Sequence, residues 1–387
     1  MSQFRVTFGI DEIGGGDGRR VGMVTNDAAM ASDGRRRSRV VLIERGWKVV
    51  RLFGPEHGLA ATAADGAKVG DGTDPVTGLP VVSLYGDRVR PSREQLADLD
   101  VLVFDIPDCG ARFYTYIWTL SHLLEACAEA RKPLIVLDRP NPIGGRLDDA
   151  EGPMLNEEYV STFVGRWNMP VRHSLTLGEL ATHWNTERKI GCDLSVVRCG
   201  GWSREMHWPA TRLPFVPMSP AMRSYESALL YPGTCLVEGT NLSEGRGTDW
   251  PFRVAGAPWL DADPIVDELN GNALPGVRFA RFDFTPSARK FADQRCSGVR
   301  ADLTDAHAVR SVPVGLLLIA AIARRHPGQF EWLLYKSATQ HAGGGHFDRL
   351  IGVEGVRDAI DDGALNAAAI TRPTGWADRV RPALLYA

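Results

Sequence analysis

Carboxylates, a histidine, arginines and tyrosines follow four successive apolar segments of the chain, at the point where each segment ends. If these segments are strands of one parallel sheet, their carboxyl ends meet at the same edge, where open α/β sheets bind their ligands. Side chains of these types can bind a polar ligand and exchange protons with it. This convergence is the clearest functional signal in the chain. The residues are, in chain order, Glu56 and His57, then Asp87, then Asp105, Asp108, Arg112, Tyr114 and Tyr116, and finally Asp138, Arg139 and Asn141.

Glu56 is the first candidate for a catalytic acid. Gly54 and Pro55 precede it, and Gly58 follows His57, a pattern typical of a backbone shaped to present a side chain. The alternative is that Glu56 is a solvated loop acid and that His57 anchors the loop.

The other residues at the segment ends allow both a structural and a functional interpretation. Asp105 could bind a substrate or accept hydrogen bonds from nearby loop amides, and Asp138 and Arg139 could form an internal ion pair. Tyr114 and Tyr116 could pack in the core or offer rings that stack on the apolar face of a sugar.

A second polar cluster lies near the middle of the chain, between glycines. It could be an ordinary connection between domains, but two carboxylates, an arginine and an asparagine favour a loop that faces a ligand. Its members are Glu238, Asn241, Glu244 and Arg246.

Charge and motifs exclude several other functions. Lys plus Arg number 44 and Asp plus Glu 47, so the net charge of −3 lacks the basic excess of a nucleic-acid-binding protein. No HExxH, P-loop or GxSxG motif occurs, no GxGxxG follows the first strand, and no cluster of His, Cys and carboxylates has ligand spacing. We therefore predict no metal, no cofactor and no nucleic-acid partner.

The apolar segments also bear on location. The longest, 314–323, is too short to span a bilayer, and the first 30 residues lack the apolar run of a signal peptide. We expect a cytoplasmic protein without membrane contact, whose oligomeric state the sequence does not define.

Six apolar segments and three helical patterns predict a Rossmann-like, doubly wound α/β domain. Near-continuous apolar strands indicate a parallel sheet that is covered on both faces. The six cysteines form no CxxC pair and are expected to be mostly small buried hydrophobic residues. The strands are predicted at 20–25, 48–53, 79–85, 101–106, 133–137 and 194–198, and the helices near 35–45, at 116–130 and at 177–184, the last after a capping box at Thr176.

The remainder of the chain predicts a smaller C-terminal α+β domain. Residues 214–259 are rich in Pro, Gly, Ser and Thr and predict a long loop, either functional or connecting two domains. A mixed segment at 277–284 follows, then a helix at 313–325 and a final helix at 355–361. We place the catalytic domain at 1–240 and an auxiliary domain at 241–387.

Together these motifs resemble the exo-β-N-acetylmuramidase family, also called NamZ-like. They occur in order over most of the chain. The resemblance implies a Rossmann-like catalytic domain, and an active site in a cleft that the auxiliary domain closes. The motifs are Phe53–Gly58 (FGPEHG), Leu79–Gly86, Asp105–Tyr116, Leu137–Pro142 and Glu238–Thr248, with Pro251–Phe252 and Gly256–Trp259.

The family implies an exo-acting glycoside hydrolase that releases terminal N-acetylmuramic acid from peptidoglycan fragments. Glu56 matches the family's catalytic acid, which would protonate the leaving oxygen, and His57 would orient it. A non-catalytic sugar-binding or nucleotide-binding protein, or an amidase or esterase acting on cell-wall fragments, is the alternative.

The second catalytic group stays open among Asp105, Asp108, Glu238, Glu244 and the acetamido group of the sugar itself. Arginines could pair with the lactyl carboxylate, because a guanidinium binds a carboxylate through two hydrogen bonds. The candidates for that pairing are Arg112, Arg139 and Arg246. The expected substrate-binding residues are Asp105, Asp108, Arg112, Tyr114, Tyr116, Arg139, Asn141, Glu238, Asn241, Glu244 and Arg246.

Overall fold

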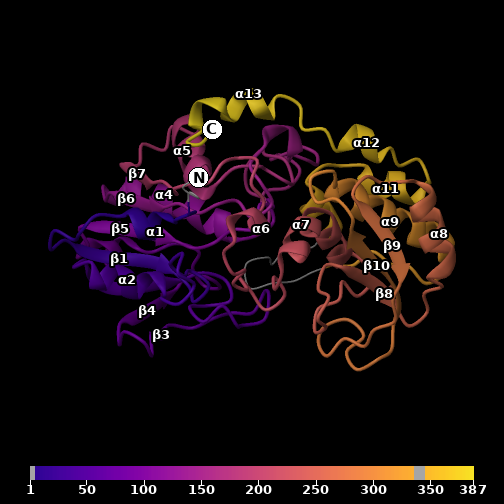
Figure 1. Cartoon of the computed structure of the whole chain (residues 1–387), viewed down its shortest axis with the longest axis horizontal. Helices are drawn as coiled ribbons and strands as arrows, with labels where there is room; N and C mark the ends of the chain where they lie inside the picture. The colour runs from indigo at the N-terminus through magenta and orange to yellow at the C-terminus, as the bar shows by residue number, and fades with distance from the viewer. Residues whose placement is uncertain (1–4, 335–344) are drawn as a thin grey trace.

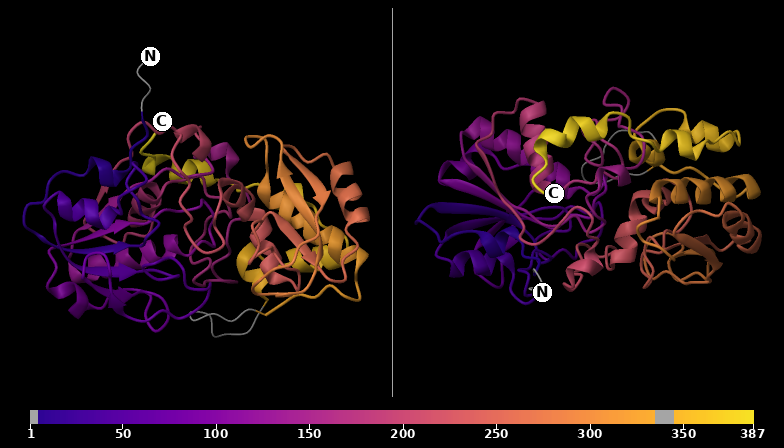
Figure 2. Two further views of the ribbon diagram at one scale, coloured as in Figure 1. Left: turned by 60° about the horizontal axis from the view of Figure 1, so that its bottom comes forward. Right: turned by 45° about the horizontal axis from the view of Figure 1, so that its top comes forward.

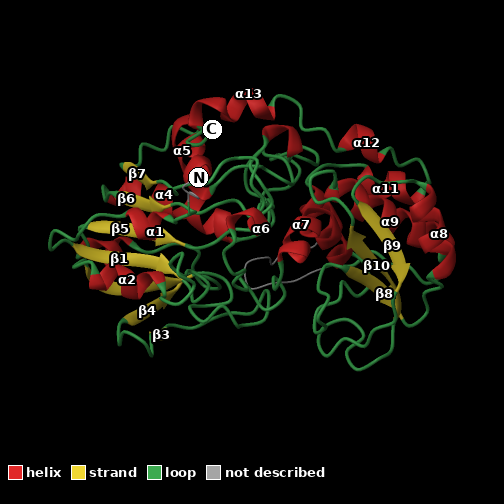
Figure 3. Ribbon diagram, viewed as in Figure 1, coloured by secondary structure: helices red, strands yellow, loops and turns green. Residues whose placement is uncertain are grey.

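The computed structural model describes residues 5–334 and 345–387, which form two sheets at opposite ends of the molecule (Figures 1 and 3). The larger sheet has the strand order β3-β4-β2-β1-β5-β6-β7, in which only β3 is antiparallel to its neighbour. Apart from β3, this is the order of a doubly wound Rossmann fold, with the reversal between β1 and β5. The strands are β1 Arg20–Thr25, β2 Lys48–Gly54, β3 Gly72–Thr73, β4 Pro80–Ser83, β5 Val101–Asp105, β6 Leu134–Leu137 and β7 Leu194–Val197.

The apolar strands form a central sheet because both of their faces are buried. In β5, Val101 and Val103 belong to one hydrophobic core, whereas Leu102 and Phe104 belong to a second core on the other face. Strand neighbours point to opposite faces, so a run without polar residues is stable only under two layers. The covering helices are α1 Gly9–Glu12, α2 Ser38–Glu44, α3 Arg93–Ala97, α4 Tyr116–Ala130 and α5 Leu177–Glu187.

The smaller sheet is antiparallel, in the order β8-β10-β9, and packs with helices from the C-terminal third. Helices α7 and α9 approach so closely that a Cβ at Gly233 would lie 1.6 Å from the carbonyl oxygen of Ser311. The remaining elements of the chain are α6 Trp208–Thr211, α7 Tyr225–Thr234, β8 Val254–Ala257, α8 Asp263–Gly271, β9 Val277–Arg281, β10 Ser297–Leu303, α9 Ser311–Arg325, α10 His346–Ile351, α11 Val356–Asp361, α12 Ala367–Ile370 and α13 Trp376–Val380, with short 3₁₀ turns η1 Leu147–Asp149, η2 Cys235–Gly239 and η3 Arg381–Ala383.

The structure confirms the α/β fold class and corrects two expectations about the C-terminal part. Residues 214–259 are not one long loop, because they contain α7 and β8. Nearly all of α7 is buried, so it has no polar face and lacks the helical periodicity that a sequence pattern would show. The helix at 356–361 is not the last, since α12 and α13 follow it.

The end of the chain returns to the Rossmann-like domain (Figure 2). The Trp376 indole donates to the His173 carbonyl at 2.9 Å, and the Leu385 N–H donates to Glu179 at the same distance. The Tyr386 hydroxyl donates to Asp138 at 2.6 Å. The two domains are therefore joined by two crossings of the chain. The boundary near residue 240 stays a prediction.

Two further features bear on the sequence predictions. All six cysteines are buried and free, which confirms them as small core residues. Over the described ranges, no helix combines the length and apolar character needed to cross a membrane.

Candidate active site

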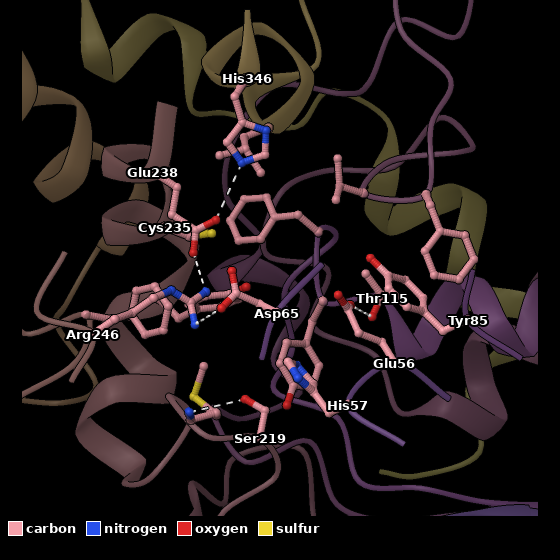
Figure 4. A pocket seen from close by; sticks show the side chains of 18 residues that line it. Glu56, His57, Asp65, Tyr85, Thr115, Ser219, Cys235, Glu238, Arg246 and His346 are labelled. Carbon is pink, nitrogen blue, oxygen red and sulfur yellow. Dashed lines mark hydrogen bonds and ion pairs between the residues drawn. The ribbon is translucent and has the colours of Figure 1, made fainter. Parts of the chain in front are cut away.

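A pocket lies where the loops after β2 and β5 meet the C-terminal domain (Figure 4). Glu56 and Thr115 are on one side, and Glu238, Arg246 and His346 are on the other. Rings of Tyr and Phe complete the walls, as expected for a site that stacks on sugars. The lining residues are Glu56, His57, Asp65, Tyr85, Phe113, Tyr114, Thr115, Phe163, Val164, Ser219, Met222, Tyr231, Cys235, Glu238, Arg246, Phe252, His346 and Leu350.

Glu56 is held in place through both of its carboxylate oxygens. The Gly66 N–H donates to Oε1 at 2.9 Å, and the Thr115 hydroxyl donates to Oε2 at 2.6 Å. Its side chain is only 7% exposed, although it lines the pocket. Burial and two hydrogen bonds leave the carboxyl group little freedom, as a catalytic group requires.

The loop after β2 presents Glu56 in a strained turn. His57 has φ 66°, a left-handed conformation that few non-glycine residues adopt. Its Nδ1 lies 2.7 Å from the Ala63 carbonyl oxygen, so the imidazole anchors the loop. His57 thus has the anchoring contact considered in the sequence analysis, and it also lines the pocket beside Glu56.

Thr115 immediately precedes α4 and orients Glu56, so its hydroxyl should matter for activity. We expect Thr115→Val to lower kcat/KM about tenfold or more, because a hydrogen bond to a charged group contributes about 1.5–3 kcal/mol. Thr115→Ser keeps the donor and should restore the activity. A kcat/KM of the valine variant close to that of the wild type would contradict this role.

The opposite wall is a network of charges centred on Arg246. Its guanidinium lies 3.1 Å from Glu244, 3.3 Å from Asp65 and 2.5 Å from Glu238. Glu238 also faces His346, at 3.5 Å from Nε2. Burial raises the pKa of Glu238, but Arg246 and His346 lower it more, so its pKa is well below the usual range. Glu238 is therefore ionised at neutral pH.

Arg112, which the sequence proposed for substrate binding, lies outside this pocket. Its guanidinium donates to the carbonyl oxygens of Pro153, Met169, Leu350 and Ile351 at 2.7–3.0 Å. It is fully buried, and burial lowers its pKa to about 9. In this structure Arg112 joins the segment around Met169 to α10.

Asp105 and Arg139 also lie outside the pocket, as a buried pair with two hydrogen bonds of 2.5 and 3.0 Å. The Asn141 amide donates to the Leu175 carbonyl, and the Asn241 amide donates to that of Gln329. The Tyr116 hydroxyl donates to the Met218 carbonyl. These contacts are structural.

The predicted residues that line the pocket with Glu56 and His57 are Tyr114, Glu238 and Arg246. Glu244 borders an adjoining cavity with Arg289 and Lys290. Asp108 lines a separate cavity at the β1–β5 edge.

Besides tyrosines and Cys235, four polar residues of the pocket were not predicted: Asp65, Thr115, Ser219 and His346. Thr115 lies between two predicted tyrosines, Tyr114 and Tyr116, so its place in the motif was the available signal. Asp65 is in a loop of small residues with no pattern, and it contacts Arg289, 224 positions away. Residues so far apart in the sequence meet only when the chain folds, so no local pattern indicates the contact.

A buried glutamate, ionised carboxylates and aromatic rings in a pocket closed by a second domain define a site typical of glycoside hydrolases. Family models for the N-terminal and C-terminal parts of exo-β-N-acetylmuramidase NamZ match residues 21–226 and 229–386. The chain therefore belongs to the NamZ family of exo-β-N-acetylmuramidases, and it is a glycoside hydrolase.

Individual relatives agree with this assignment. The chain is 42% identical over 346 residues to a Bacillus subtilis (strain 168) protein named peptidoglycan β-N-acetylmuramidase NamZ, covering 89% of this chain and 81% of that protein. Two crystal structures of DUF1343 family proteins from Bacteroides fragilis NCTC 9343 are also similar. One has a TM-score of 0.83 and 30% identity, covering 99% of each chain. The other has a TM-score of 0.73 and 28% identity, covering 98% of this chain and 99% of that one.

Proposed function

We propose that this protein releases terminal N-acetylmuramic acid from peptidoglycan fragments, with Glu56 as the general acid. The observation that carries the proposal is the buried, doubly hydrogen-bonded Glu56 carboxyl group in a pocket with walls from both domains. A pocket with such walls suits the end of a glycan chain. The relative named as a peptidoglycan β-N-acetylmuramidase supports the choice of sugar.

In the proposed reaction, Glu56 gives a proton to the glycosidic oxygen as the bond to the anomeric carbon breaks. Positive charge then develops on the sugar ring, as in other glycoside hydrolases. Of the carboxylates considered for the second role, Glu238 is the one that shares the pocket with Glu56. Because it is ionised, Glu238 can stabilise that charge or assist the attack of water or of the acetamido group.

The first test is turnover of a chromogenic N-acetylmuramic acid glycoside by the purified protein. Release of the chromophore together with free N-acetylmuramic acid would support the proposal. Binding without turnover would indicate a sugar-binding protein, and release of a peptide or acyl group instead would indicate an amidase or esterase. Either result would overturn the proposed function.

The lactyl carboxylate should make muramic acid glycosides better substrates than N-acetylglucosamine glycosides. Three basic side chains, each paired with a carboxylate, lie together along the wall of the adjoining cavity: Arg246, Arg289 and Lys290. We expect kcat/KM to be about tenfold or more higher for the muramoside, since a hydrogen bond to a charged group contributes about 1.5–3 kcal/mol. Arg289→Ala should bring the kcat/KM values of the two glycosides closer together. Equal rates on matched chromogenic glycosides of the two sugars would contradict lactyl recognition.

The reaction should not require a metal ion. Among the residues that the structure describes, no three His, Cys, Asp or Glu side chains form a group that could hold a metal. Proton transfer by a carboxylic acid needs no Lewis acid. We expect the same rate before and after incubation with excess EDTA. Loss of activity that added zinc or magnesium restores would show this expectation to be wrong.

A further inference from the structure

The N–H group that holds Glu56 belongs to a tight turn at residues 64–67. The Ala67 N–H donates to the Ala64 carbonyl oxygen at 3.1 Å, which closes the turn around the Asp65–Gly66 peptide group. Gly66 has φ 70°, whereas Asp65 is not among the residues with positive φ. This combination defines a type II turn. The N–H of its central peptide group is the one that donates to Glu56 Oε1 at 2.9 Å.

A turn of this kind has two accessible forms. Glycine at the third position accepts φ of either sign, so the turn can adopt type I or type II geometry. The two types differ by a rotation of the central peptide group, which reverses the directions of its C=O and its N–H. In the type I form the Gly66 N–H would point away from Glu56. The turn type therefore decides whether Glu56 keeps one of its two hydrogen bonds.

Arg289, in the connection between β9 and β10, holds the other end of the same peptide group. Its Nη2 donates to the Asp65 carbonyl oxygen at 2.5 Å, and its Nε donates to Asp65 Oδ1 at 3.2 Å. In a trans peptide group the C=O and the N–H point in opposite directions, so a donor that holds the carbonyl oxygen also fixes the direction of the N–H. Arg246 contacts the carboxylate of Asp65 at 3.3 Å, and such a side-chain contact does not define the direction of the peptide group.

The connection that carries Arg289 is tightly wound and anchored beside the pocket. Three of its non-glycine residues, Arg289, Phe291 and Asp293, have φ of 58–67°. Strained backbone of this kind gathers at functional sites. The next residue, Lys290, donates to the Thr240 carbonyl oxygen at 2.9 Å, directly after the η2 turn. The guanidinium is therefore presented from a fixed part of the C-terminal domain.

We propose that Arg289 is a positioning residue for the reaction, which fixes the Asp65–Gly66 peptide group in the orientation that donates to Glu56. The inference rests on the proposed role of Glu56 as the general acid. Arg289 belongs to the C-terminal domain and the turn belongs to the Rossmann-like domain. The acid is therefore fully held only while the two domains are in contact here, so the C-terminal domain contributes to proton transfer as well as to the walls of the pocket.

Substrates whose leaving groups differ in their need for a proton test this role. Arg289→Met removes the donors and keeps the length of the side chain. For N-acetylmuramic acid β-linked to N-acetylglucosamine, whose leaving sugar must be protonated, we expect kcat to fall about tenfold or more, as part of the general-acid contribution. For the dinitrophenyl muramoside, whose leaving group departs without a proton, kcat should stay within about threefold of wild type. A purely structural defect would lower both rates alike, and that result would overturn the proposal.

Two further variants serve as controls for the methionine variant. Arg289→Lys keeps a cationic donor and should recover part of the lost kcat on the disaccharide. Arg295→Met removes an arginine of the same connection whose side chain is 80% exposed, and it should match the wild type on both substrates.

The choice of sugar separates positioning from recognition of the lactyl group. Loss of positioning should lower kcat for N-acetylglucosamine glycosides by the same factor as for muramosides, because the hydrogen bond to Glu56 does not depend on the lactyl group. A loss confined to the muramosides would assign Arg289 to lactyl recognition alone and would overturn the proposal.

A variant of the turn tests the shared path without changing Arg289. In Gly66→Ala the new side chain disfavours positive φ, so the turn should change to type I and lose the hydrogen bond to Glu56. Since both changes then remove the same interaction, the double variant Gly66→Ala/Arg289→Met should lose about as much kcat on the disaccharide as either single variant. Losses that multiply in the double variant would overturn the proposal.

NMR tests the hydrogen bond without turnover. Labelling with ¹³C at the aspartate carbonyl and ¹⁵N at glycine selects the five Asp–Gly peptide groups of the chain, and the signal missing in Gly66→Ala is that of Gly66. We expect Arg289→Met to shift this amide proton upfield by more than the other four signals, and Arg295→Met to leave it in place. An unmoved signal in Arg289→Met would overturn the proposal. A wild-type protein that hydrolyses no muramoside would instead overturn the proposed function, so the two failures give different results.

Discussion

Replacement of Glu56 by glutamine is expected to lower kcat by about 10²–10⁴-fold, the usual contribution of a general acid. Glutamine is nearly isosteric with glutamate but has no acidic proton to give to the glycosidic oxygen. The measurement is turnover of the chromogenic muramoside, made together with thermal unfolding.

The fold should tolerate this change because the amide satisfies both existing contacts. Its oxygen can accept from the Gly66 N–H, and its NH₂ group can donate to the Thr115 hydroxyl oxygen, which then turns its own proton elsewhere. We therefore expect a melting temperature close to that of the wild type. Glu205→Gln, an exposed acid in the same domain, is the control. Activity within a few-fold of wild type would remove Glu56 from the mechanism.

Replacement of Arg246 by methionine is expected to destabilise the protein by about 3–5 kcal/mol. The variant removes the partner that three carboxylates share, and a buried charge that loses its main partner is costly. One basic partner remains for each: Arg289 for Asp65, His346 for Glu238 and Lys290 for Glu244. Urea denaturation at pH 7 measures the change in the free energy of unfolding. Arg278→Met, at an exposed position of β9, serves as the control and should stay within about 0.5 kcal/mol of wild type. A loss no larger than that of the control would contradict the central role of Arg246.

The loss of stability in the Arg246→Met variant should depend on pH in a defined direction. In the wild type the pKa of Glu238 is lowered, so its contribution to stability is present above its unfolded pKa and is lost at low pH. Without Arg246 the pKa of Glu238 rises, because only His346 then opposes the effect of burial, so the variant loses less stability than the wild type as the pH falls. The difference in the free energy of unfolding between the wild type and the variant should therefore become smaller from pH 7 to pH 5. A constant difference would show that the lost contacts are not electrostatic.

The sequence was most informative where local pattern determines structure. Residues 20–25 and 116–130 form β1 and α4 with the predicted bounds, and Thr176 accepts the hydrogen bond of its capping box. Glu56 could be selected because the glycines and proline around it indicate a shaped turn. In each case the residues that carry the signal are neighbours in the chain.

The sequence was least informative where contacts join distant parts of the chain. Arg112 and Thr115 belong to one motif, yet Arg112 turns to backbone carbonyls while Thr115 contacts Glu56. Motif membership does not reveal the direction of a side chain. Asp65 meets Arg246 and Arg289 only after the C-terminal domain has packed on the loop after β2.

The returning C-terminal tail limits how members of this family can be recombined. Tyr386 reaches the β6 end through Asp138, and the carbonyl of Ala387 accepts from the Arg204 N–H. A chimaera cut once between the domains would combine the tail of one parent with the sheet of the other. A viable exchange of the C-terminal domain would need two junctions, with the segment after α12 kept from the parent that supplies the sheet. For the same reason, a purification tag is better placed at the amino terminus than after Ala387.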